Sequence, residues 1–154
     1  MEKSYVMVKP GFANNPKVIS YIKNRLIEGG LKIVAEKFVR YSTSAAQDHY
    51  AEHFRDSYEN SKPFYKNLEA YITSDKVYGM EVHGENAIIK IRELVGSTIK
   101  TNKETGEKIL PNKGTIRYEV PLMLNEEHKI TENVIHASDS PGAAEKELNI
   151  FKNL

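Results

Sequence analysis

Apolar residues along this chain alternate between the spacing typical of strands and the spacing typical of helices. A short apolar run over residues 4–8 ends at Lys9-Pro10-Gly11, because proline cannot donate a hydrogen bond to a sheet and glycine permits a turn. Val18, Ile22 and Leu26 then recur at four-residue spacing, which places them on one face of a helix. The beginning of the chain is therefore predicted to be a strand followed by an amphipathic helix.

The rest of the chain continues in the same manner and closes with a strand and a helix. The further elements predicted are strands over 31–41, 76–83 and around 134–135, helices over 42–54, 62–73, 85–95 and 143–151, and irregular stretches over 97–114 and 118–132. In the strand over 31–41, Ile33, Ala35 and Val39 are expected on the buried side. The stretch 97–114 is rich in Lys, Thr, Asn and Gly, so we expect a surface loop with a small hairpin near 105–106.

The order of these elements predicts the fold class. Strands and helices follow one another as β-α-β-α-α-β-α-loop-β-α, without internal repeats. This order fits an α+β sandwich of the ferredoxin-like kind, in which helices pack on a four-stranded antiparallel sheet. A length of 154 residues is the size of one domain, so residues 1–154 are expected to form a single unit.

Composition and charge narrow the range of partners and compartments. The chain is 40% hydrophobic and 28% charged, as in ordinary soluble globular proteins, and its net charge of +1 gives no global attraction to nucleic acid or membranes. It contains no cysteine, so it has no disulfide framework and no thiolate metal site. The first residues lead into a strand instead of a long apolar segment, so no signal peptide is expected. We therefore expect a cytoplasmic protein.

The candidate chemistry lies where the last strand breaks. His136 is followed by Ser138, Asp139 and Ser140, all of which favour the position just before a helix, and Pro141 suits the first helical position. The histidine is thus placed beside helix N–H groups that attract anions. An isolated histidine more often fills a surface or core position than carries out chemistry. The following helix, however, holds Glu147, and a carboxylate that accepts from one imidazole nitrogen leaves the lone pair on the other, as a nucleophile requires.

The segment Asn133 to Asp139, with Glu147 eleven residues after the histidine, resembles the active-site signature of nucleoside diphosphate kinases. Other segments match that family in the same order along the chain: Val8-Lys9-Pro10, Asp48-His49-Tyr50, the segment 62–68, Gly84-Glu85-Asn86-Ala87 leading to Arg92, and Gly114-Thr115-Ile116-Arg117. Six short motifs in one order are far more specific than any one of them alone.

The resemblance implies transfer of the γ-phosphoryl group from a nucleoside triphosphate to a nucleoside diphosphate, by a ping-pong mechanism through a phosphohistidine. The catalytic positions that it implies are His136, Glu147, Lys9, Tyr50 and Ser138, and the nucleotide-binding positions are Lys9, Phe64, Leu68, Arg92, Thr98, Arg117, Ile130 and Asn133. In the family, the positions of Arg92 and Thr98 hold the β-phosphate, and those of Lys9 and Arg117 approach the transferred group. Phe64 would stack on the base opposite Ile130.

The resemblance also implies a cofactor and an assembly. Mg²⁺ would be held mainly by phosphate oxygens and water, since no carboxylate cage is visible in the sequence, so no metal-ligating residue is expected. A homo-oligomer is expected, as a hexamer, a tetramer or a dimer, with no specific nucleic acid and no membrane as partners.

Simpler interpretations remain open for several positions. Tyr50, Phe64 and Leu68 could be packing residues, and Ser138 could be only a helix cap. The family's acidic residue after Lys-Pro is replaced by Gly11, and the segments around 51–62, 99–113 and 118–132 look longer than is typical. The same fold can also serve as a nucleotide-binding or regulatory module without turnover. A degenerate homologue of that kind would be expected to lose the nucleophile, the lysine or an arginine, and none is lost here.

Overall fold

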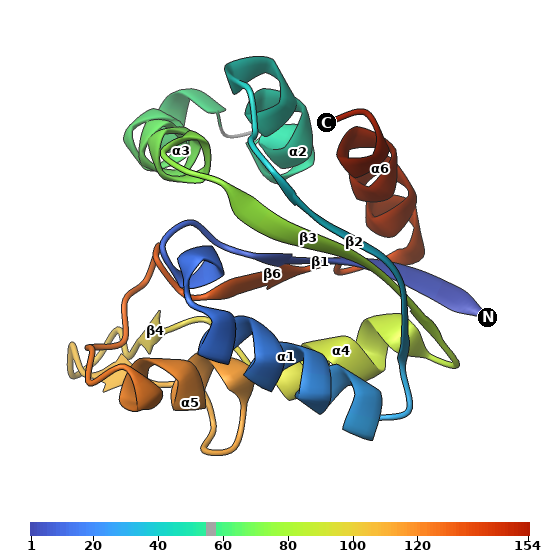
Figure 1. The fold of residues 1–154 in the computed structure, drawn as a ribbon. Coiled ribbons are helices and arrows are strands. Elements are labelled where there is room, and N and C mark those ends of the chain that lie inside the picture. The colour runs from blue at the N-terminus through green and yellow to red at the C-terminus, as the bar shows by residue number, and fades with distance from the viewer. Residues whose placement is uncertain (55–57) are drawn as a thin grey trace.

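A four-stranded antiparallel sheet forms the centre of the computed structural model, which describes the backbone of residues 1–54 and 58–154 and the side chains of residues 1–51 and 66–154 (Figure 1). The strand order is β2-β3-β1-β6, and every neighbouring pair is antiparallel. The four strands are β1 (Glu2–Val8), β2 (Lys32–Val39), β3 (Val77–Gly84) and β6 (Ile135–Ala137). This is the predicted α+β arrangement.

Helices cover both faces of the sheet (Figure 1). One layer consists of α1 (Pro16–Glu28), α4 (Ala87–Val95) and α5 (Ile116–Met123), and the other of α2 (Thr43–Phe54), α3 (Tyr58–Thr73) and α6 (Pro141–Lys152). A short 3-10 turn, Phe12–Asn14, precedes α1, and a small hairpin of β4 (Lys100–Thr101) and β5 (Lys108–Ile109) extends from the α4–α5 connection. The predicted hairpin is therefore confirmed. In the described part of the chain, every helix is too short or too polar to span a bilayer.

The central strand β1 is buried on both faces, which explains its unbroken apolar run. Val6 and Val8 belong to the core beneath α1, α4 and α5, whereas Tyr5 and Met7 belong to the core beneath α2, α3 and α6. Successive side chains of a strand point to opposite faces, so the same run supplies both cores.

Three expectations about the elements were wrong. Ala35 is exposed, because β2 is an edge strand whose pairing with β3 shifts between Ile33 and Ala35. Helix α3 begins at Tyr58, four residues before the predicted start. The stretch 118–132 is not wholly irregular, because α5 occupies residues up to Met123.

Helix α5 was missed because it contains Pro121, which removes one helical hydrogen bond and normally argues against a helix. Ile116, Val120 and Pro121 are all buried against the core. Tertiary packing of this apolar face outweighs the local cost of the proline, and the helix ends two residues later.

Candidate active site

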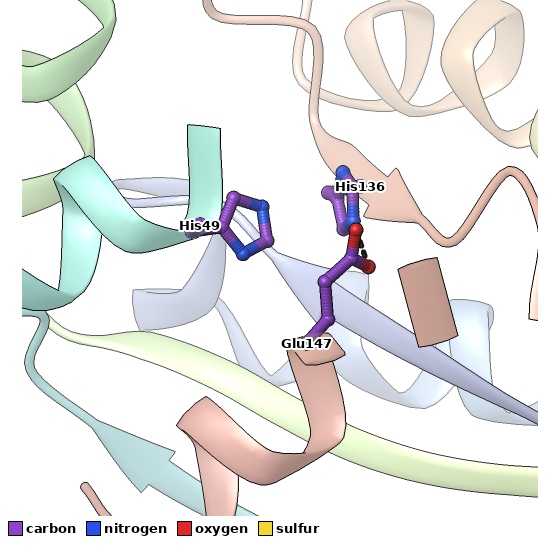
Figure 2. A group of neighbouring side chains, drawn as sticks. All are labelled: His49, His136 and Glu147. Atoms are coloured by element: carbon purple, nitrogen blue, oxygen red, sulfur yellow. Dashed lines mark hydrogen bonds and ion pairs between the residues drawn. The ribbon is translucent and has the colours of Figure 1, made fainter. Parts of the chain in front are cut away.

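His136 lies in the middle of β6 and is paired in register with Met7 of the central strand. Its neighbours Ile135 and Ala137 are buried, and His136 itself keeps a partly exposed side chain. Because Met7 faces α2, α3 and α6, the imidazole lies on that side of the sheet. Figure 2 shows the ring directed toward Glu147, which extends from α6. The strand thus presents the histidine between the sheet and the helical layer.

Glu147 and Ser138 hold this imidazole in place. His136 Nε2 lies 2.7 Å from Glu147 Oε1, and Ser138 Oγ donates to the same oxygen at 2.8 Å. The Ser138 hydroxyl in turn accepts from the backbone N–H of Tyr5 at 3.0 Å, which ties the carboxylate to the central strand. A carboxylate at Nε2 favours the tautomer that carries its proton there and its lone pair on Nδ1.

The turn before the histidine is strained. Val134 has a φ of 80°, which is rare for a β-branched residue, and the backbone N–H of Ile135 donates to Asn133 O at 3.0 Å across it. The Val134 carbonyl accepts from the N–H of Lys9 at 2.8 Å, and its side chain is fully buried. Packing and this hydrogen bond therefore fix an unusual backbone conformation two residues before His136.

Lys9 follows the end of β1 and is almost completely buried. Its Nζ donates to Asn133 Oδ1 at 2.6 Å and to Thr131 O at 3.4 Å. Burial, assisted by the Arg117 guanidinium, lowers the pKa of Lys9 to about 7. Among the described residues no carboxylate is bonded to Lys9, so an incoming anion would stabilise its charged form.

Arg117 lies in the first turn of α5, and its side chain reaches the histidine strand. Its guanidinium donates to Ile135 O at 2.8 Å and to Gly96 O at 2.9 Å, and its buried Nε has no hydrogen-bond partner among the described residues. Gly96 ends α4 at a φ of 89°, and a Cβ there would lie 2.5 Å from Thr115, so this close approach needs glycine. Burial and the nearby charge of Arg92 lower the pKa of Arg117 to about 10.

A groove of about 500 Å³ lies between α3 and the segment 127–132. Asn67, Tyr71 and the exposed Ile130 line it. A separate and much smaller cavity, of about 10 Å³, shares the lining residues His128, Lys129 and Glu132 with the groove. Thr98, Arg117 and Asn133, which have predicted roles, also line this small cavity.

The remaining predicted positions differ in their surroundings. Tyr50 on α2 is buried, and burial together with the charge of Glu147 raises its pKa. Leu68 packs in the core beneath α2, α3 and α6 and does not line the groove. Arg92 lies in the exposed last turn of α4. The side chain of Phe64 lies outside the described residues.

The sequence patterns gave no role at this site to two residues, the first of which is His49. It lies on α2, is buried, and its ring centroid is 4.6 Å from that of His136. Tyr5 is a second such residue, with its hydroxyl 2.8 Å from that of Tyr41 and its ring 6.1 Å from His136. The only signal for His49 was its place one residue before Tyr50 in a matching motif.

The family model and the similar proteins all carry the same family name. A family model described as nucleoside diphosphate kinase matches residues 2–153. The nucleoside diphosphate kinase of Thermoplasma acidophilum is 40% identical over 152 residues, which cover 99% of this chain and 88% of the relative. That of Staphylococcus saprophyticus is 38% identical over 151 residues, which cover 98% of this chain and 87% of the relative.

The fold agrees with the sequence comparison. The structure of a halophilic nucleoside diphosphate kinase from Halobacterium salinarum in complex with CDP superposes with a TM-score of 0.75 and 32% identity, covering 97% of this chain and 86% of that one. Sequence and fold therefore agree over nearly the whole length, and the chain belongs to the nucleoside diphosphate kinases, enzymes that transfer a phosphoryl group between nucleotides.

Proposed function

We propose that His136 is the nucleophile of this transfer. The Nδ1 lone pair attacks the γ-phosphorus of a nucleoside triphosphate, the bond to the β–γ bridging oxygen breaks, and the nucleoside diphosphate leaves with that electron pair. A second nucleoside diphosphate then attacks the phosphohistidine and regenerates the imidazole. The observation that carries the proposal is the chain of hydrogen bonds from Ser138 through Glu147 to His136 Nε2, which orients the ring and offsets its developing positive charge.

The cations beside the histidine fit the charge of the transferred group. Negative charge spreads over three equatorial oxygens in the transition state, so the site needs fixed positive charges and donors. Lys9 and Arg117 supply them next to His136, with Arg92 and Thr98 further out for the β-phosphate. Asn133, held by Lys9, would bind the sugar hydroxyls. The base would lie in the groove between α3 and Ile130.

The divalent metal that this family generally requires would be Mg²⁺ held by the nucleotide. Within the described residues, the one group of three or more His, Asp or Glu side chains close enough to share an ion contains two imidazoles, which suit Mg²⁺ poorly. Phosphate oxygens and water are therefore the fitting ligands. When bound, the ion would neutralise charge on the β- and γ-phosphates.

The exposed edge of the sheet fits the expected homo-oligomer. Within the described part of the chain, strand β2 is hydrogen-bonded to β3 alone, and its side chains Val34 and Phe38 are 42% and 49% exposed. An unpaired apolar edge strand favours pairing with another chain. A second copy that pairs with β2 about a twofold axis would extend the sheet and cover these side chains.

The direct test is phosphorylation of the protein by γ-labelled ATP. Wild type is expected to take up an acid-labile, alkali-stable label, the signature of phosphohistidine, and His136→Ala to take up none while it still folds and binds nucleotide. His83→Ala is the matched control, because His83 also bonds a carboxylate, Glu81, at 2.6 Å but lies outside the site. Substantial turnover by His136→Ala, or binding of nucleotide by wild type without any label, would refute the proposal. The second result would favour a regulatory module without turnover.

A further inference from the structure

Two imidazoles and a carboxylate meet where α2, β6 and α6 converge. His49, His136 and Glu147 come from these three elements, and one possible ligand atom of each lies within 4.8 Å of the other two (Figure 2). His49 and Glu147 are 2% and 3% exposed. Phosphoryl transfer as proposed above uses His136 and Glu147 but assigns nothing to His49.

We propose that His49, His136 and Glu147 form an inhibitory site for a transition-metal dication of the Zn²⁺ type. Two imidazoles and one carboxylate are a ligand set that zinc accepts in proteins, with the fourth position left for water or a substrate oxygen. Imidazole nitrogen favours zinc, copper or nickel over Mg²⁺, which prefers oxygen. The Mg²⁺ carried by a nucleotide therefore does not compete strongly for this site.

The three candidate ligand atoms already lie close together, within 4.8 Å of one another. Ligand atoms about 2.1 Å from a tetrahedral zinc ion are about 3.4 Å from one another. His136 Nε2 and Glu147 Oε1 are 2.7 Å apart, so this pair would open slightly, and any separation in the group above about 3.4 Å, at most 4.8 Å, would shorten. Ser138 continues to orient the carboxylate from behind, a supporting contact that is typical of metal sites.

Charge and access set the strength of the site. Glu147 and two neutral imidazoles neutralise one of the two charges of Zn²⁺. The cations Lys9 and Arg117, which bond backbone carbonyls of the segment 131–135 just before His136, repel the ion. An anion in the fourth position would compensate for them, so phosphate or nucleotide is expected to strengthen zinc binding. The ion would enter past His136, whose side chain is 15% exposed.

Metal binding at either nitrogen of His136 removes the nucleophile. Zinc on Nδ1 occupies the lone pair directly. Zinc on Nε2 leaves the single proton of the neutral ring on Nδ1, and no lone pair remains there to attack phosphorus. This inhibitory consequence rests on the proposed role of His136 as the nucleophile, whereas zinc binding itself does not.

Zinc binding is measured first, on the nucleotide-free protein, by competition with a metallochromic indicator. Wild type is expected to bind one Zn²⁺, and His49→Gln to bind it at least about tenfold more weakly, since even supporting residues around a metal change affinity by that much. His83→Gln is the matched control, because the His83–Glu81 pair reproduces the His136–Glu147 pair without belonging to the three-ligand group. Equal affinity in wild type and a folded His49→Gln would overturn the proposal, as would a tenfold loss in His83→Gln.

X-ray absorption of zinc-loaded wild type needs no variant. The expected spectrum contains two imidazole ligands and one or two oxygens at about 2.0–2.2 Å. A shell of one imidazole or none would overturn the site even if His49→Gln failed to fold.

A phosphorylation assay then distinguishes failure of the zinc-site proposal from failure of the proposal that His136 is the nucleophile. Zinc-loaded wild type is expected to lose at least about nine-tenths of its labelling by γ-labelled ATP at excess Mg²⁺ and to recover it after chelation. Zinc-free wild type that takes up no label refutes the nucleophile, not the metal site. Zinc-loaded protein with two imidazole ligands and undiminished labelling overturns the inhibitory role.

Discussion

At the scale of single residues, the role proposed for Glu147 is to stabilise positive charge on the attacking imidazole. It is buried, and its Oε1 contacts both His136 Nε2 and Ser138 Oγ. Glu147→Gln keeps a hydrogen-bond acceptor but no longer offsets the charge that the ring gains as it attacks phosphorus. We expect the rate of phosphorylation, measured by stopped flow, to fall by roughly ten- to a hundredfold.

Glu81→Gln is the control for this substitution. Glu81 bonds His83 at 2.6 Å outside the site, so the same chemical change there should leave the rate unaltered. If Glu147→Gln and wild type share one rate, Glu147 is only a charge on α6 and not the partner that activates the histidine.

The lowered pKa of Lys9 predicts that the protein takes up protons when it binds a nucleotide. Its pKa is lowered to about 7, first by burial and then by Arg117, so at pH 8 the amine is mostly neutral in the nucleotide-free protein. A bound polyphosphate favours the charged ammonium and raises this pKa. Binding of MgADP should therefore take up close to one proton at pH 8 and much less at pH 6, where Lys9 is already charged.

Calorimetric titrations in buffers of different ionisation enthalpy measure this uptake. Lys9→Gln should abolish the difference in uptake between pH 8 and pH 6, because it removes the titrating group. Equal proton uptake at both pH values in wild type would contradict the assignment of Lys9 to the phosphate site.

At the scale of elements, the connection from β6 to α6 combines stability with orientation of the site. Ser140 caps α6 by accepting from Ala143 N at 3.1 Å, while Ser138 links Glu147 to the backbone of β1. The two serines lie two residues apart in the same connection between β6 and α6. Of the two, only Ser138 contacts the carboxylate of Glu147, which bonds His136.

Substitutions of the two serines are therefore expected to differ in their effects on the unfolding free energy and on the phosphorylation rate. Ser138→Ala leaves the buried N–H of Tyr5 and the carboxylate each short of a partner, so it should lower the unfolding free energy by about 1–3 kcal/mol and also slow phosphorylation. Ser140→Ala should lower the unfolding free energy by about 1 kcal/mol and leave the phosphorylation rate unchanged. Denaturant unfolding and stopped-flow phosphorylation measure the two quantities. A Ser138→Ala protein with the wild-type rate would reduce Ser138 to a structural link.

At the scale of the whole molecule, the exposed edge strand β2 predicts that two copies of the chain pair through this strand. Val34→Lys places a charge on the exposed edge strand and should lower the mass observed in sedimentation velocity, because the charge would be buried between two copies. Ile89→Lys is the control, since Ile89 is 63% exposed on α4, away from that edge. Wild type that sediments as a monomer at all concentrations, or a Val34→Lys protein with the wild-type mass, would contradict pairing through β2.

Much of the fold could be predicted because local signals agreed with tertiary packing. Asn15 caps α1 by accepting from Lys17 N, and Val18, Ile22 and Leu26 on that helix are all buried, as their spacing indicates. The exceptions are Ala35, the start of α3 and the helix that contains Pro121. The exposure of Ala35 follows from the irregular edge of the sheet, and Pro121 is tolerated because of the core beneath α5.

Residue types and their spacing were enough to predict the class of fold, the strand that presents His136 and the carboxylate on the next helix. These features depend on short-range periodicity and on contacts between neighbouring elements, which residue types and spacing largely specify. Only the tertiary structure placed His49 against His136, lowered the pKa of Lys9 and fixed Val134 at a strained φ. Each of these features depends on burial and on contacts between segments that are distant in the chain. The free energy that maintains them comes from tertiary packing, which no local stretch of sequence specifies.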